Sequence, residues 1–204
     1  MSLDEERPEQ AKLTDARALR ALSHPVRLAL LEALSTGPLT ATQAGERIDE
    51  SPTTCSFHLR QLAKYGFVEE AGGGSGRSRP WRRSHLGWVA PVQPGNQEFT
   101  MAAQALDRVL LRRYWDRLTR WLETSPSYPR EWQQASDSSE YGFFATDQEL
   151  AELTAEYHAV LRRHLDRWKD RYEDPSKRPP GARPVEVLTF AYPFELPGSS
   201  GQEG

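Results

Sequence analysis

The chain has 204 residues, a formal net charge of −3 and one cysteine. This length is ample for a hydrophobic core, and a single cysteine argues against a disulfide framework of the secreted kind. No apolar run approaches the roughly 18 residues of a membrane span, and the acidic start has no apolar signal region. We therefore expect a cytoplasmic protein without a membrane partner.

Residues 1–10 are polar and predict a disordered N-terminus. Clear helix signals follow at residues 39–48, where Thr40 is placed as an N-cap, Gln43 as its capping-box partner and Leu39 as a hydrophobic staple. We expect a short supporting helix there. Residues 49–50 leave room only for a tight turn before the next helix, and two short helices joined in this way cross steeply, as in a helix-turn-helix.

The next helix begins at a strong N-terminal signal. Ser51 suits the N-cap, Pro52 suits the first helical position, and Gly66 predicts the stop, which gives a helix of about four turns. Cys55, Leu59 and Leu62 recur at helical spacing on one face, which we expect to be buried. The remaining positions are short, polar or cationic: Thr53, Ser56, Phe57, Arg60, Gln61 and Lys64.

This outward face suits the major groove of DNA, because small hydroxyl residues allow close approach and an arginine binds guanine or phosphate. A surface helix without a ligand would look similar, so the interpretation depends on the flanking elements. The expected DNA contacts come from the supporting helix, the recognition helix and the hairpin that follows. They are Thr40, Thr42, Gln43, Ser51, Thr53, Thr54, Ser56, Phe57, Arg60, Lys64, Arg77 and Arg79.

A β-hairpin is predicted after the recognition helix. Residues 67–71 read as one strand, residues 72–78 as a glycine-rich loop, and residues 79–84 as the return strand. Pro80 lacks an N–H for the ladder and confines its strand to an edge, as in a wing. Residues 51–85 hold six Lys and Arg against two Glu, a balance of +4, so the rest of the chain sums to −7. A local cationic patch of this kind favours a nucleic-acid face.

These features together resemble the winged helix-turn-helix regulators of the ArsR/SmtB type, in particular an ArsR-like branch with a long C-terminal extension. The resemblance runs from about Leu19 to Trp88 and is much less diagnostic after that point. The matching residues are Ala21 to Leu31, Leu39 to Ile48, Ser56 to Leu62, Gly66 to Val68 and Arg79 to Arg82. The resemblance implies a homodimer on a two-fold symmetric double-stranded DNA operator, with one recognition helix in each half-site.

No metal site and no cofactor are expected. Metal-sensing members of the resembled family carry paired cysteines or sets of Asp, His and Glu, and this chain shows neither. Cys55 is its only cysteine, and one thiolate cannot build a soft-metal site within a protomer. We interpret Cys55 as a core residue, with a redox switch as the alternative. His158 and His164 are six residues apart and lie on different faces of a helix.

A linker at residues 91–96 precedes a long amphipathic helix over about residues 97–123. In the resembled family this helix pairs with its two-fold mate, so we expect a dimerisation helix. The alternative is that it packs only on its own winged domain. The expected dimerisation residues are Phe99, Leu106, Leu110, Tyr114 and Leu118.

The C-terminal part begins with a turn-rich interval at residues 124–139. A capping box at Thr146 and Glu149 then opens a helix that continues to about Glu173, where prolines follow. Residues 185–193 read as a short strand, and residues 195–204 as a disordered tail rich in Gly and Ser.

Aromatic residues are frequent in this C-terminal part. Aromatic walls with a few polar tips suit a small-molecule pocket, although aromatics at helical spacing are more often core. The candidate effector pocket comprises Trp115, Trp121, Phe144, Tyr157 and Trp168. In the resembled family, ligand binding shifts a dimer between states that bind DNA and states that do not.

The expected fold is mainly α-helical: a winged helix-turn-helix with a small β-hairpin, then a helical extension with a short C-terminal strand. The expected boundaries are 1–10 for the disordered start, 11–90 for the DNA-binding domain, 91–194 for the dimerisation and effector region, and 195–204 for the tail. We expect a sequence-specific transcription regulator, a homodimeric repressor with operator affinity modulated by a small molecule. The alternative is a winged-helix protein-interaction module without sequence-specific DNA binding.

An enzyme is the third class considered. The titratable groups Tyr157, His158, His164 and Asp166 share one helix, with no nucleophile motif, phosphate loop or metal set nearby. We therefore do not expect an enzyme.

Overall fold

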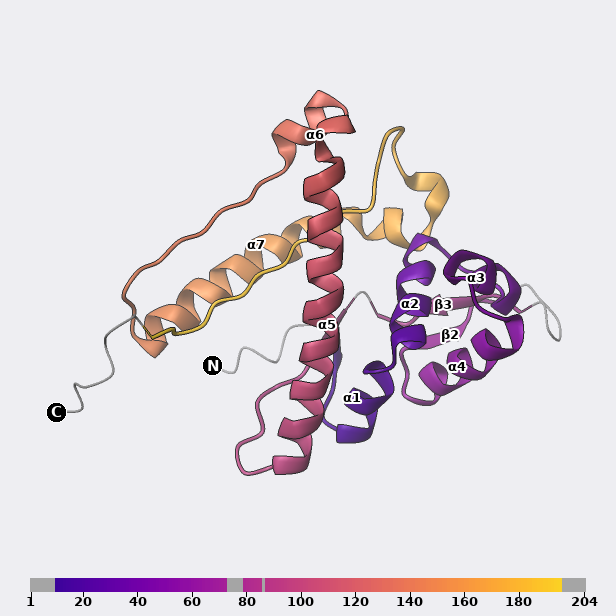
Figure 1. Ribbon diagram of the computed structural model, residues 1–204, viewed down its shortest axis with the longest axis horizontal. Helices are drawn as coiled ribbons and strands as arrows, with labels where there is room; N and C mark the ends of the chain where they lie inside the picture. The colour runs from indigo at the N-terminus through magenta and orange to yellow at the C-terminus, as the bar shows by residue number, and fades with distance from the viewer. Residues whose placement is uncertain (1–9, 73–78, 86, 196–204) are drawn as a thin grey trace. The chain divides into compact units, whose positions relative to one another are not determined.

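The computed structural model describes residues 10–72, 79–85 and 87–195. Disorder was predicted for residues 1–10 and 195–204, of which only Gln10 and Glu195 are among the described residues, and Gln10 lies in a strand. The predicted DNA contact Arg77 also falls outside the described residues. The fold is mainly α-helical, as predicted, and divides into two compact units, residues 1–139 and 140–204 (Figure 1).

The first unit opens with a short strand and two helices. Strand β1 (Gln10–Lys12) precedes α1 (Ala16–Leu22), and α2 (Pro25–Ala33) follows after a break at Ser23 and His24. The break has a local cause, because Pro25 occupies the first turn of α2 and the His24 side chain accepts a hydrogen bond from the Val26 N–H at 3.2 Å. A 3-10 turn, Leu34–Thr36, ends the pair.

Helices α3 (Ala41–Ile48) and α4 (Pro52–Lys64) form the predicted helix-turn-helix (Figure 1). The capping box of Thr40 and Gln43 and the N-cap of Ser51 are both confirmed. Asp49 ends α3 in the left-handed conformation, with φ of 57°, and so turns the chain sharply into α4.

The core of the first unit lies under α4. The inward positions Cys55, Leu59 and Leu62 are fully buried, as predicted. They pack with α1, α2 and α3 in one cluster that also takes in Phe67 and Val68. Such burial stabilises by about 1.5–3 kcal/mol for each large apolar side chain, so this face fixes α4 on the domain.

The wing is a short antiparallel pair of β2 (Val68–Glu70) and β3 (Trp81–Arg83), in which Glu69 lies opposite Arg82. An isolated bridge between Leu39 and Trp81 joins the wing to the segment before α3. A further pair was not predicted: β1 runs parallel to β4 (Gly87–Val89). The first residues of the described chain are therefore held by pairing with the segment after the wing.

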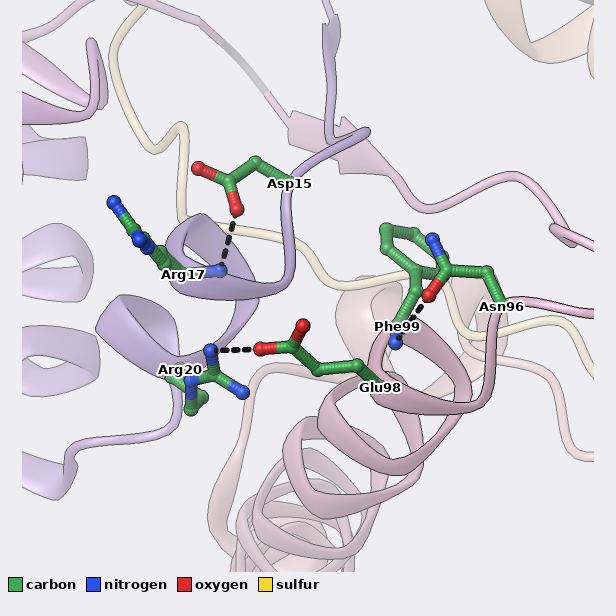
Figure 2. Close-up of polar contacts among 6 residues, drawn as sticks. All are labelled: Asp15, Arg17, Arg20, Asn96, Glu98 and Phe99. Carbon is green, nitrogen blue, oxygen red and sulfur yellow. Dashed lines mark hydrogen bonds and ion pairs between the residues drawn. The ribbon is translucent and has the colours of Figure 1, made fainter.

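Helix α5 (Gln97–Thr124) begins at Asn96, whose side chain accepts a hydrogen bond from the Phe99 N–H at 3.1 Å (Figure 2). It packs along α1, and an ion pair of 2.7 Å between Arg20 and Glu98 links the two helices (Figure 2). Phe99, Ala102 and Leu106 of α5 are buried in the core of the same chain. Further along, Glu32 of α2 forms ion pairs with Arg113 and Arg117.

The interval after α5, predicted as turns, contains a 3-10 turn at Ser125–Ser127 and a short helix, α6 (Arg130–Ala135). Pro129 at the N-cap position presets the backbone for this helix.

The second unit is built on α7 (Asp147–Glu173), whose capping box of Thr146 and Glu149 confirms the predicted start. A 3-10 turn, Pro175–Lys177, follows. The predicted strand at residues 185–193 is wrong, because the structure shows this segment outside any helix or strand. A strand needs a neighbouring strand for its ladder, and the described strands pair only as β1 with β4 and β2 with β3. None of the described helices is long and apolar enough to cross a membrane.

Candidate nucleic-acid interface

The geometry of the α3–α4 turn is set by a glycine. A Cβ built on Gly45 would lie 2.4 Å from the carbonyl oxygen of Glu50 and 3.6 Å from Sγ of Cys55. The Glu50 N–H also donates to the Gly45 carbonyl oxygen at 3.0 Å. Gly45 thus lets α3 and the start of α4 approach more closely than any other residue would allow. This role could not be predicted from the sequence, because Gly45 carries no turn signal within a helical pattern.

The outward face of α4 is exposed along its length. Thr53, Phe57, Arg60 and Lys64 are exposed, with 51% of Phe57 accessible to solvent, while Ser56 is half-buried between them. Arg60 makes no hydrogen bond or ion pair with any described residue. Lys64 lies 5.8 Å from the centre of the Tyr65 ring. One cation, one apolar ring and hydroxyl groups on one helical face are the groups that read base edges.

The capping residues among the predicted contacts have local roles. Thr40 and Gln43 exchange the two hydrogen bonds of the capping box, at 2.9 and 3.2 Å. Ser51 accepts from the Thr54 N–H at 3.0 Å, and the two hydroxyls lie 2.8 Å apart. A side chain that caps its own helix holds the helix N-terminus in position and has less freedom to seek a base. Thr42, in the first turn of α3, is exposed.

The wing cations are partly neutralised within the chain. Arg79 pairs with Glu70 at 2.9 Å, and Arg82 pairs with Glu69 at 2.7 Å. The pair of Arg82 and Glu69 joins β3 to β2, and the pair of Arg79 and Glu70 joins the residues before β3 to β2. About half of each side chain is exposed. The net charge of +4 for residues 51–85 includes these acids, but the sequence alone does not pair them with particular arginines. The register of Glu69 opposite Arg82 supplies that assignment.

A histidine pair lies on the inward side of α4. The rings of His24 and His58 lie with their centroids 4.4 Å apart, and only 8% of His58 is exposed. Nδ1 of His58 is buried without a hydrogen-bond partner among the described residues. Burial lowers the pKa of both histidines, and the nearby Arg27 adds to this, whereas Glu50 opposes it. The pair is therefore favoured in its neutral form.

Cys55 is fully buried, and burial, with a smaller contribution from Glu50, raises the pKa of its thiol. A thiolate is the reactive form of cysteine, so this environment disfavours a redox role. Among the described residues, no group of three or more His, Cys, Asp and Glu is placed to hold a metal ion.

The predicted dimerisation residues divide between the core and the surface. Phe99 and Leu106 are buried within their own chain, Leu110 packs against the core, Tyr114 is half-buried and Leu118 is exposed. The C-terminal half of α5 also exposes further large apolar side chains at positions that share one face. This set, the α5 exposed face, comprises Leu111, Trp115, Leu118 and Leu122.

The predicted effector residues belong to both units. Trp115 and Trp121 lie in the first unit, and Phe144, Tyr157 and Trp168 in the second. Trp115 and Phe144 are largely exposed, Phe144 to 96%. Trp121 contacts Tyr128 edge to face at 4.9 Å between ring centroids and lines a hollow of about 240 Å³ with Ser125, Gln133, Ser136, Asp137 and Ser138.

Comparison with known protein families matches part of the first unit. Residues 22–71, which span α2, α3, α4 and β2, match a family model described as a helix-turn-helix domain. A search of curated proteins found no match. The chain therefore carries a helix-turn-helix domain, of the type found in DNA-binding regulators, and α4 is its second helix.

Proposed function

We propose that this protein is a homodimeric transcription regulator of the ArsR-like type, a repressor that inserts α4 into the major groove of a two-fold symmetric operator. The observation that carries the proposal is the outward face of α4. It presents Thr53, Phe57 and Arg60 to solvent, while the opposite face is fully buried in the domain core. A rigidly seated helix with an accessible arginine fits direct readout, because a guanidinium donates two hydrogen bonds to guanine and an aromatic ring contacts the thymine methyl group.

The wing has a supporting role in this proposal. Because Arg79 and Arg82 already pair with Glu70 and Glu69, a DNA phosphate must compete with these carboxylates for them. The exposed pairs are weak, so an anionic backbone is able to displace them. We therefore assign most of the sequence preference to α4, with the wing contributing salt-dependent phosphate contacts.

The dimer is proposed from the α5 exposed face. Leu111, Trp115, Leu118 and Leu122 repeat at intervals of four, three and four residues, which places them along one side of the helix. Exposed apolar side chains in such a row are the pattern of a helix that pairs with another helix. The buried residues Phe99 and Leu106 hold α5 on its own domain, so a dimer contact there would move with the DNA-binding helices.

The hollow beside Trp121 is the observation that supports the small-molecule effector. Its volume of about 240 Å³ is below the range of roughly 300–1,000 Å³ usual for ligand pockets. The other four predicted effector residues do not line it. We therefore keep the effector as a subordinate part of the proposal, to be tested by adding a Trp121→Ala variant to any ligand screen.

A protein-interaction module is the second candidate function. The exposed Phe57 would suit a protein partner as well as a base edge, since large exposed apolar side chains mark both kinds of surface. Arg60, which pairs with none of the described residues, favours DNA, because such a guanidinium attracts phosphate and guanine without first breaking an ion pair.

The test is a titration of duplex DNA with wild type, Arg60→Ala and Arg130→Ala at several salt concentrations. Arg130, on α6, is an exposed cation of the first unit outside the helix-turn-helix and controls for net charge. We expect Arg60→Ala to weaken binding to a sequence enriched by the wild type by about 1–3 kcal/mol and to relax base preference. Equal effects of the two substitutions would show that the DNA face has been assigned wrongly.

A further inference from the structure

Helix α7 exposes a row of apolar and aromatic side chains. Leu153, Tyr157, Val160 and His164 repeat at intervals of four, three and four residues, so they lie along one side of the helix at about 100° per residue. We call this set the α7 open face. Leu153 and Val160 are exposed to 48% and 46%, and Tyr157 to 36%, whereas His164 is half-buried, with its Nδ1 buried and its ring 5.2 Å from that of Trp168. In the second unit, the less exposed positions of α7, among them Leu150, His158 and Leu161, lie on an adjoining face.

The charges along α7 are separated into two halves. Residues 147–156 contain four acids and no base, whereas residues 161–171 contain five bases and two acids. The acids of the first half are Asp147, Glu149, Glu152 and Glu156, and the bases of the second are Arg162, Arg163, Arg167, Lys169 and Arg171. This order agrees with the helix dipole, which favours acids near the N-terminus and bases near the C-terminus.

The same separation appears along the edge of the α7 open face. Helical geometry places Glu149, Glu156, Arg163 and Arg167 on one flank of that face, in the order acid, acid, base, base. Glu156, Arg163 and Arg167 are exposed, and none of the three forms a hydrogen bond or ion pair within the described part of the chain. These three charges therefore have no partner among the described residues of the protomer, whereas Glu149 is engaged in the capping box with Thr146.

We propose that α7 pairs antiparallel with α7 of a second copy of this chain through the α7 open face. In this arrangement Leu153 packs opposite His164 of the second copy, Tyr157 opposite Val160, and Glu156 lies beside Arg163. The two-fold axis brings the acidic half of each flank against the basic half of the other. A parallel two-fold pair would instead set this flank against the opposite, apolar flank of the second copy, where Leu150 and Leu161 lie, and would leave its charges without a counter-charge. The order of the charges therefore favours a second α7 as the partner helix and an antiparallel direction for the pair.

Helix α5 is the competing occupant, since its exposed face has the same intervals. The matching positions beside the α5 exposed face hold Asp107, Tyr114 and Trp121, and those on its other side hold Arg108, Arg112 and Thr119. Neither side carries acids followed by bases along the helix. The helix whose charges complement those of the α7 flank is therefore α7 of a second copy.

The experiment is disulfide cross-linking of the full-length protein through cysteines on the α7 open face. Leu153 and His164 are eleven positions apart, or about 16 Å along the helix, so cysteines there cannot bond within one chain. The Leu153→Cys/His164→Cys variant is expected to give a covalent dimer under mild oxidation, and each single variant none. The native Cys55 is fully buried and does not interfere.

The ion pair is tested in the same background by charge exchange. Glu156→Arg alone and Arg163→Glu alone are each expected to lower the yield of covalent dimer by raising the dissociation constant about ten-fold, since each creates two like-charge contacts per dimer. The combined Glu156→Arg/Arg163→Glu variant is expected to recover the yield. Asp166→Arg, on the opposite side of α7, is the matched control and should leave the yield unchanged.

Several results would overturn the proposal. Cross-linking of Leu153→Cys alone would indicate a parallel pair, and no covalent dimer from the double variant would mean that another segment or protein occupies the α7 open face. The cross-linking result does not depend on the DNA-binding proposal. If the covalent dimer forms but does not bind DNA, the DNA-binding proposal is contradicted and the α7 pair is supported. If the protein binds DNA but forms no covalent dimer, the α7 pair is contradicted and the DNA-binding proposal is supported.

Discussion

Replacing Gly45 with alanine tests how the structure positions α4 against α3. The new Cβ would lie 2.4 Å from the Glu50 carbonyl oxygen, 0.6 Å inside the 3.0 Å limit that such contacts respect. The obstructing atom is backbone and cannot rotate away. Overpacking of this kind lowers the stability of the folded protein by about 1–3 kcal/mol. The higher helix propensity of alanine raises that stability by about 1 kcal/mol relative to glycine. We expect a net loss of up to about 2 kcal/mol in the free energy of unfolding.

The assay is urea denaturation followed by circular dichroism, with DNA affinity measured in parallel. Because relief of the clash must move the turn at Asp49 and Glu50, α4 should tilt and bind DNA less well even where the protein remains folded. Gly142→Ala is the matched control, since a Cβ at Gly142 would have no neighbouring atom within 4 Å. A Gly45→Ala protein as stable as the wild type, with unchanged DNA affinity, would refute the proposed role of the close approach.

Three further predictions concern the wing, the histidine pair and α5. Glu70→Gln should tighten DNA binding several-fold in a low-salt titration, because it frees Arg79 and removes a negative charge from the DNA face; weaker binding would contradict this. His24 and His58 have lowered pKa values, so the unfolded chain takes up protons before the native one, and stability should fall as pH drops below about 6.5. Urea midpoints at pH 7 and pH 5.5 measure this, and His58→Leu should reduce the difference. Asn96→Ala removes the N-cap of α5 and should cost about 1 kcal/mol of stability by thermal unfolding.

Helix boundaries were well predicted from the sequence because they depend on local chemistry. The caps at Thr40, Ser51 and Thr146 each satisfy backbone N–H groups within the next three residues, and all three are present in the structure. The buried face of α4 followed from the spacing of Cys55 and Leu59, which any amphipathic helix obeys.

Features that depend on distant residues were predicted poorly. The pairing of β1 with β4 joins segments far apart in the chain, and three-residue strands carry almost no periodicity. The segment at 185–193 alternates like a strand, but alternation does not supply a neighbouring strand, so the prediction was wrong there. The close approach at Gly45 and the pairing of Arg79 with Glu70 likewise depend on tertiary geometry. In the candidate site, the exposed groups of α4 were foreseeable, whereas the partial neutralisation of the wing was not.

The most direct test of the central claim is selection of bound duplexes from a random-sequence library by the wild-type protein. A dimer that reads DNA through α4 should enrich a motif of two half-sites related by two-fold symmetry, with centres about 10 base pairs or a multiple of that apart. Arg60→Ala should lose preference at particular positions of each half-site. Recovery of no motif, or of the same motif with unchanged preference by Arg60→Ala, would contradict the assignment of α4 as the reading helix.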